Sequence, residues 1–384
     1  MRVLVSGLST INSIGTNIND FWNNLLLGKS GITEYTKYNV KTKYAIVNDF
    51  EKHIAPGTED LGRATSLLLT CIEDAVFSSG LDFADVDPGK IGISIGTTMG
   101  ELGKHEDIVF GSPLKSMKIE RPYMMTDKVA SYLKISGPIW TVTNACAAGN
   151  YAIAKAYEDI KSGRADVMIA GGVDAFSLTA YAGFNSLRAI TPELCRPFDQ
   201  HRKGLVLGEG AGILILESEE HFLKRKNGQA LASISGFGLT ADAYHVTKPD
   251  PKARGAISAM ELALKMAGIT PLDIKFVSSH GTGTPSNDYM EAISLNHVFG
   301  KGIKTNSIKA NIGHTLGAAS AIEAVVCIMA LNEMKLPPTI NLIKKDPVIT
   351  ADVITEKQEF TSRYIMSNSY AFGGVNSSLI LEKV

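Results

Sequence analysis

A cysteine lies where a strand pattern gives way to a helix pattern. Residues 138–143 read PIWTVT, residues 144–149 read NACAAG, and a helical pattern follows over 150–163. Cys146 therefore sits at a helix start, where unpaired N–H groups and the positive end of the helix dipole favour the thiolate. The small residues after it leave room for a substrate. A lone cysteine is more often a buried structural residue, but this setting makes Cys146 the candidate nucleophile, with a thiol pKa expected below that of a free thiol.

The other three cysteines give no such signal. Cys71 and Cys327 lie in apolar helical stretches, and Cys195 lies in the loop pattern ELCRPFD. None of the four forms a CxxC pair, which favours free thiols in a reducing compartment over a disulfide scaffold. The sequence therefore predicts a cytoplasmic protein.

Two histidines and a lysine lie in turns of small residues that follow strand patterns. His280 belongs to FVSSHGTGTPSND, and Lys309 and His314 belong to IKANIGHTLGAAS. Such turns can present side chains to a cavity, and a neutral imidazole that donates one N–H polarises a carbonyl. A thiol and two histidines can also bind a metal, but no pair has the short spacing common in structural zinc sites. We therefore predict no metal.

Short apolar strand patterns alternate with helix patterns along the chain. The strand patterns lie at 3–7, 91–96, 140–143, 167–172, 212–217, 232–238, 276–281 and 378–382, and helix patterns lie near 18–27, 255–267 and 287–298. This alternation indicates an α/β fold with buried strands. Because 384 residues exceed what one core usually serves, we expect two halves, residues 1–224 and 225–384, joined in the polar segment 221–229.

The overall charge excludes some partners. A formal net charge of −1 gives no global field that would attract nucleic acid or a membrane surface. No uninterrupted apolar run approaches the roughly 18 residues that a membrane-spanning helix needs. We predict neither a nucleic-acid nor a membrane partner, so an anionic partner must meet a local basic patch.

Four segments, in this order, resemble the signatures of the elongating β-ketoacyl-[acyl-carrier-protein] synthases: TNACAAGN, HGTGTPSND, KANIGH and NSYAFGGVN. The resemblance covers essentially the whole chain. It implies the thiolase-like five-layer αβαβα fold with two similar halves. It also implies a dimer in which the strand around residues 139–142 pairs across the interface. Whether the partner is an identical or a homologous chain stays open.

The resemblance implies a decarboxylating condensation between a carrier-bound acyl chain and malonyl-carrier protein. Cys146 would take the acyl group from a phosphopantetheine thioester, with an oxyanion hole made by the N–H groups of Cys146 and Phe372. His280 and His314 would hold the malonyl thioester oxygen while CO2 leaves. No cofactor is implied beyond the phosphopantetheine of the substrates, and an acyl carrier protein is the implied partner.

Further residues match supporting positions of the family. Lys309 would support the histidines, with Glu323 and Asp288 in the same buried network, although such a network can also serve only to fix geometry. The other matches are Thr282 and Thr284 for the pantetheine amides, Phe372 as an aromatic gate, Gly373 and Gly374 as its hinges, and 242–245 as a second mobile loop.

A basic residue matches the position that meets the acidic carrier protein. That residue is Arg188, and an ordinary surface salt bridge is the competing interpretation. Arg196 and Arg202 follow closely in the sequence, and we expect them at the same surface.

Related activities fit less well. A thiolase would need a second catalytic cysteine late in the chain, and the segment YAFGGVN has none. A chain-initiating synthase would have asparagine where His314 stands. A silent chain-length subunit would lack the nucleophile, but the chain can still be the active half of a heterodimer with such a subunit. Fatty-acid, polyketide and polyene pathways stay open, as does the acyl chain length.

Overall fold

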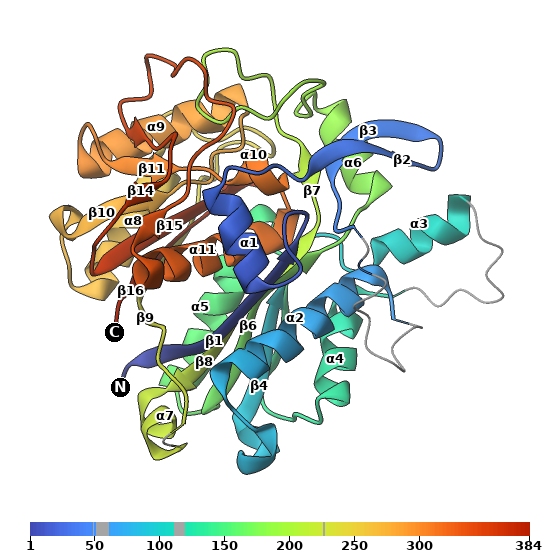
Figure 1. The fold of residues 1–384 in the computed structure, drawn as a ribbon, viewed down its shortest axis with the longest axis vertical. Coiled ribbons are helices and arrows are strands. Elements are labelled where there is room, and N and C mark those ends of the chain that lie inside the picture. The colour runs from blue at the N-terminus through green and yellow to red at the C-terminus, as the bar shows by residue number, and fades with distance from the viewer. Residues whose placement is uncertain (49, 51–60, 111–119, 226) are drawn as a thin grey trace.

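Two sheets with the same strand order form the frame of the molecule (Figure 1). The structure is a computed structural model, and it describes residues 1–48, 50, 61–110, 120–225 and 227–384. The N-terminal sheet has the order β5-β4-β6-β8-β1. Its strands are β1 (Val3–Asn12), β4 (Ile91–Gly96), β5 (Ile139–Val142), β6 (Val167–Asp174) and β8 (Gly210–Ser218).

The C-terminal sheet repeats this topology as β11-β10-β15-β16-β9. In each half the first three strands of that order are parallel, and the last two join by antiparallel pairing. The strands are β9 (Ala232–Ala241), β10 (Ile274–Ser278), β11 (Lys304–Asn306), β15 (Tyr364–Ala371) and β16 (Val375–Glu382), with β13 (Asp352–Val353) beside β11. β1 and β9 pair over two residues each and so join the two sheets into one continuous eleven-stranded sheet.

Helices cover both faces of each sheet. α5 (Ala148–Lys161) and α11 (Ala319–Glu333) lie between the sheets, α2 (Arg63–Ser79) covers β1 and β8, and α8 (Arg254–Ala267) covers β9 and β16. β6 and β8 are buried along their whole length, as strands covered on both faces must be. The predicted αβαβα fold with two similar halves is confirmed.

The two middle helices pack very closely. A Cβ atom on Gly149 of α5 would lie 2.7 Å from the backbone nitrogen of Ala321 in α11, so only glycine fits there. The segment Leu316–Glu333 is long and apolar enough to cross a membrane, but 83% of it is buried inside the protein. Glu323 interrupts it, which explains why the sequence shows no uninterrupted apolar run of that length.

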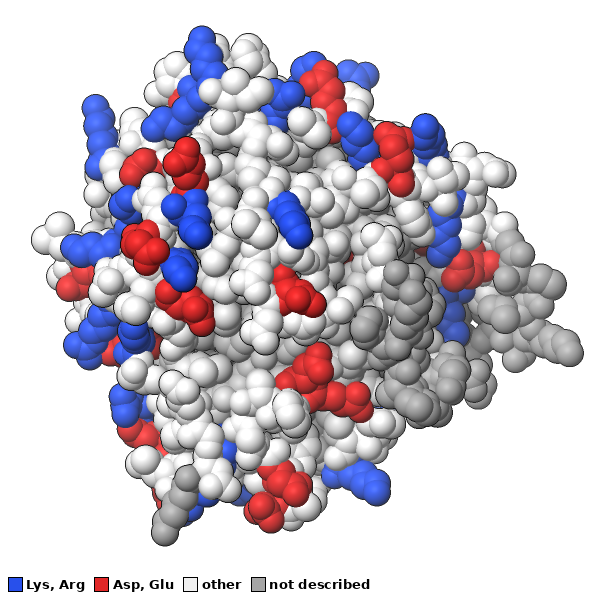
Figure 2. All heavy atoms as spheres, viewed as in Figure 1, with Lys and Arg blue, Asp and Glu red and all other residues white. Residues whose placement is uncertain are grey.

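The remaining elements surround this frame. They are α1 (Ile18–Leu26), β2 (Ile32–Lys37), β3 (Val40–Ala45), α3 (Leu102–Phe110), α4 (Pro122–Tyr132), α6 (Leu178–Ser186), β7 (Leu207–Gly208), α7 (Glu219–Arg225), α9 (Pro285–Phe299), α10 (Lys309–Ile312), β12 (Lys335–Leu336) and β14 (Gln358–Glu359). The domain boundary predicted after residue 224 falls at the end of α7 and stays a prediction. Figure 2 shows basic and acidic side chains interspersed over one face, in keeping with the small net charge.

Candidate active site

Cys146 is held in a sharp turn between β5 and α5. The turn is a single 3-10 turn, Ala145–Ala147, and Ala145 takes a left-handed backbone conformation with φ of 49°. Such a conformation is uncommon for a residue with a Cβ atom and marks a position that the surrounding structure enforces. The Cys146 side chain is buried, and it lines a narrow cleft.

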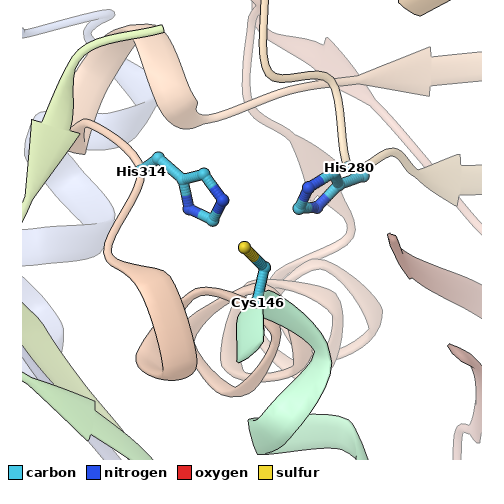
Figure 3. A group of neighbouring side chains, drawn as sticks. All are labelled: Cys146, His280 and His314. Carbon is cyan, nitrogen blue, oxygen red and sulfur yellow. The ribbon is translucent and has the colours of Figure 1, made fainter. Parts of the chain in front are cut away.

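The fold brings both predicted histidines to the thiol. His280 follows β10, and His314 lies between α10 and the 3-10 turn Leu316–Ala318. One ligand-type atom from each of Cys146, His280 and His314 lies within 4.8 Å of the other two. Figure 3 shows the thiol pointing between the two imidazole rings, whose centroids are 5.2 Å apart.

The two histidines have different hydrogen-bond partners. The N–H of Leu316 donates to Nδ1 of His314 over 3.3 Å, so the proton of this neutral ring belongs on Nε2. Ser369 Oγ donates to the carbonyl oxygen of Cys146 over 3.1 Å and lies 3.4 Å from Nδ1 of His280. A hydroxyl that donates to this carbonyl accepts from the Nδ1–H of His280, and we assign His280 that tautomer on the basis of the shorter contact to the carbonyl. Nε2 of His280 is then left with a lone pair.

This pattern bears on metal binding. Sequence spacing does not exclude a metal, because the fold brings Cys146, His280 and His314 together as a cluster of possible ligands. A metal bound to Nε2 of His314 would, however, require the ring proton to be on Nδ1. That N–H would then face the N–H of Leu316, and the hydrogen bond between them would be lost. The absence of a metal stays a prediction.

Burial controls the protonation of the cluster. It lowers the pKa of His280 and of His314 well below the usual histidine value, and the charge of Lys309 lowers both further. Burial raises the pKa of the Cys146 thiol to about 12, with the charge of Lys309 acting in the opposite direction. The expected low thiol pKa is therefore wrong in direction, because desolvation of a buried thiolate outweighs the favourable helix start. The resting site holds a thiol and two neutral imidazoles.

Lys309 and Glu323 form the predicted buried pair. Nζ of Lys309 donates to Oε1 of Glu323, and both side chains are almost fully buried. Burial raises the pKa of Glu323 to about 7 although Lys309 lowers it. The pair places a fixed positive charge near the thiol and the histidines.

Asp288 belongs to a different set of contacts. Its carboxylate accepts N–H bonds from Phe198 (2.9 Å) and Gly283 (3.2 Å), and it lies 3.5 Å from Nε of Arg202. Asp288 therefore fixes the loop that carries Thr282 and Thr284, whereas the ion-pair partner of Lys309 is Glu323. The expectation that Arg202 lies at the surface is wrong, because Arg202 is buried between Asp288 and Asp346.

Two buried carboxylates that sequence reasoning missed hold the catalytic turns. Glu291 accepts the N–H groups of His280 and Gly281, each over 2.8 Å. Asp174, at the end of β6, accepts N–H bonds from Thr98, Met99 and Gly317. Burial raises the pKa of Glu291 to about 7 and that of Asp174 to about 6. The available signal was an acidic residue just after or within each motif. The N–H partners of Asp174 lie 75 to 143 positions away, so no local pattern links them to it, whereas those of Glu291 lie only 10 and 11 positions away.

Phe372 stands at the entrance of the cleft. Its ring is 37% exposed and stacks on Phe184 of α6, with centroids 5.3 Å apart. Gly373 and Gly374 follow with φ of 86° and 73°, conformations that favour glycine. The N–H of Gly373 donates to the carbonyl oxygen of Val246 over 2.7 Å. The N–H of Asp242 donates to the carbonyl oxygen of Gly374 over 2.8 Å. The two predicted mobile loops are thus bonded to each other.

Thr282 and Thr284 line the same cleft as Cys146, with their hydroxyl oxygens 2.9 Å apart. Arg188 lies outside it, exposed at the end of α6, where it lines the depression at the cleft mouth. It also lines a neighbouring groove together with Lys41 and Lys43 of β3. No ion pair of Arg188 is found within the described ranges, so the salt-bridge alternative has no partner there.

Comparisons with known proteins agree over the full length. The model of the β-ketoacyl synthase N-terminal domain matches residues 1–221, and that of the C-terminal domain matches residues 231–343. The curated 3-oxoacyl-[acyl-carrier-protein] synthase 2 of Staphylococcus aureus (strain N315) is 33% identical over 407 residues, which cover 100% of this chain and 98% of the relative.

Solved structures are similar over the same length. The ishigamide ketosynthase/chain length factor matches with a TM-score of 0.92 and 35% identity, over 100% of this chain and 99% of that chain. A ketosynthase in complex with its type II PKS acyl-carrier protein matches with a TM-score of 0.90 and 29% identity, again over 100% and 99%.

Proposed function

The chain belongs to the β-ketoacyl synthase family and is a condensing acyltransferase, and on that premise we propose how its residues perform the reaction. The observation that carries the proposal is the convergence of Cys146, His280 and His314 in one buried cleft. The thiol is the nucleophile, and the Nε2–H of His314 is a hydrogen-bond donor to the malonyl thioester oxygen. His280, which the resemblance implied as a second donor to that oxygen, acts in this proposal as the base for the thiol, because its Nε2 is assigned the lone pair.

Acylation begins with a neutral thiol. The sulfur of Cys146 attacks the thioester carbonyl of the acyl donor while its proton passes to Nε2 of His280. The N–H groups of Cys146 and Phe372 hold the resulting oxyanion. When the donor C–S bond breaks, the same proton goes from His280 to the departing pantetheine thiolate, so no net charge is left in the buried site.

Condensation follows with the malonyl donor. Loss of CO2 leaves an enolate, whose oxygen accepts the Nε2–H of His314. The enolate carbon attacks the acyl carbonyl on Cys146 and the C–S bond to the enzyme breaks. The Cys146 thiolate that departs takes up one proton from solvent when the product leaves and the cleft opens, which restores the neutral thiol. Burial of the three residues excludes water, which would otherwise protonate the enolate or hydrolyse the acyl-enzyme.

The donors are carried by an acyl carrier protein in this proposal. A similar ketosynthase has been solved with its carrier protein. Thr282 and Thr284 line the cleft where the pantetheine amides would pass, and Phe372 with its two glycines acts as the gate. Arg188 shares its groove with Lys43 and with an ion pair between Lys41 and Glu34, so Arg188 and Lys43 are the basic side chains that it offers to the acidic carrier. No further cofactor and a cytoplasmic location are proposed.

A second ketosynthase-like chain completes the molecule in this proposal. β5 is an edge strand, and Ile139 and Trp140 on it are about 40% exposed. Exposed apolar side chains on an unpaired edge invite strand pairing with another chain. A homologous partner is favoured by the similar ketosynthase/chain length factor. An identical partner chain would present the same β5 edge for pairing, so a homodimer is the alternative assembly.

The test is acylation of Cys146 followed by intact-mass measurement. Incubation with a panel of acyl-carrier proteins should add one acyl mass to the protein, and malonyl-carrier protein should then remove it as β-ketoacyl product. Cys146→Ser should take up no acyl group while its circular dichroism is unchanged. Condensed product from Cys146→Ser would refute the mechanism, and the preferred acyl chain would identify the substrate class.

A further inference from the structure

A depression at the cleft mouth collects positive charge from three separate segments. Arg188, Lys203 and Lys248 line it, and no acidic residue is among its described lining residues. Lys203 is paired with Glu193 over 2.6 Å. Arg188 and Lys248 are exposed, and neither has an ion-pair partner among the residues that the structure describes.

This depression is continuous with the catalytic cleft. Thr247, Lys248, Thr284, Ser286 and Phe372 line both of them. A folded carrier protein is too large to enter beyond the gate residue, so the group that crosses this point must be the prosthetic arm. The only charged group on that arm is its phosphodiester, and the mouth offers it two unpaired cations and several hydroxyls.

The backbone around both cations is fixed. Nδ1 of His245 accepts the N–H groups of Thr247 (3.0 Å) and Lys248 (3.2 Å), which holds the start of the Lys248 side chain in place. Arg188 has a left-handed backbone with φ of 55°, just after α6, where glycine is the usual residue. A long basic side chain in that conformation carries a backbone cost, which is consistent with a role at the mouth.

We propose that Lys248 and Arg188, with the hydroxyls of Thr247 and Ser286, form a phosphate-binding subsite that holds the phosphodiester of the donor's phosphopantetheine arm. The proposal rests on the proposed function and adds to it the group that aligns the arm before its thioester reaches Cys146. Lys248 is the critical residue, because it borders both the mouth and the cleft.

Two small donors that differ only in the phosphate test this subsite. Acyl-pantetheine and acyl-4′-phosphopantetheine are compared by the rate of Cys146 acylation, and the wild type should show a KM about five-fold lower for the phosphorylated donor. Lys248→Ala should bring the two KM values together without changing that of acyl-pantetheine. Lys252→Ala, an exposed lysine of the same loop that does not line the mouth, should behave as the wild type.

The outcomes separate the two proposals. If neither small donor nor acyl-carrier protein acylates Cys146, the proposed function fails, and if acyl-carrier protein acylates it while acyl-4′-phosphopantetheine does not, the phosphate subsite is wrong. If both donors react with equal KM in the wild type, or if the difference persists in Lys248→Ala, the phosphate subsite is wrong. Lys248→Ala could also raise the KM for acyl-carrier protein while leaving the KM of both small donors unchanged. That result would assign Lys248 to the surface that contacts the carrier protein and would also overturn the phosphate subsite.

Discussion

Replacing His314 by alanine removes one hydrogen-bond donor from the place where the enolate oxygen forms. In the structure the Leu316 N–H occupies Nδ1, so the imidazole has only its Nε2–H to offer, and the methyl group of an alanine would offer no donor at all. Loss of one such donor from a buried site costs about 3 to 4 kcal/mol of transition-state stabilisation. We therefore expect His314→Ala to decarboxylate malonyl-carrier protein roughly 100- to 1,000-fold more slowly.

The half-reactions distinguish this role from that of His280. CO2 release reports decarboxylation, and single-turnover intact mass reports acylation of Cys146. His280→Ala should slow acylation by roughly 100-fold or more because the base for the thiol is lost. His297→Ala, on the exposed end of α9, is the matched control and should leave both rates unchanged. Decarboxylation by His314→Ala within about ten-fold of the wild type would refute the donor assignment.

Three further predictions follow from the charges of the site. Burial raises the pKa of Cys146 to about 12, so the rate of its alkylation by iodoacetamide should increase with pH up to about pH 10. An alkylation rate that stops increasing below about pH 8 would show that the thiolate is favoured at neutral pH. Lys309→Met removes the charge that lowers the pKa of Glu323, so this carboxyl should titrate above pH 7 in the folded state. A carboxyl whose pKa is raised in the folded state stabilises the fold below its unfolded-state pKa, and this stabilisation is lost as pH rises through the folded-state pKa. Urea unfolding of Lys309→Met should therefore show a lower free energy of unfolding at about pH 8 than at about pH 5.5. A pH dependence equal to that of the wild type would contradict this. Finally, the KM for acyl-carrier protein should rise with salt, and Arg188→Glu should raise it by about five-fold at low salt while the KM for acyl-pantetheine stays constant. Equal salt responses of both donors would place the carrier surface elsewhere.

Local sequence was sufficient to select the candidate reacting groups, and the resemblance to a known family implied their roles. Cys146, His280 and His314 each follow a strand pattern in a turn of small residues, and strand and helix patterns depend on neighbours within a few positions. For the same reason the predicted strands and helices appear in the structure within a few residues, and the repeat of the strand order confirms the two similar halves.

Only the tertiary structure decided how those groups are charged and bonded. The high pKa of Cys146 comes from burial by segments distant in sequence, which outweighs the local helix start. The difference between the histidines depends on Ser369, which lies 89 positions from His280 and 223 from Cys146. Likewise Arg188 and Arg202 were both expected at the surface, yet one is exposed at the cleft mouth and the other is buried beside Asp288. Desolvation and hydrogen bonding act between residues that meet only in the folded chain, so no periodicity in the sequence encodes them.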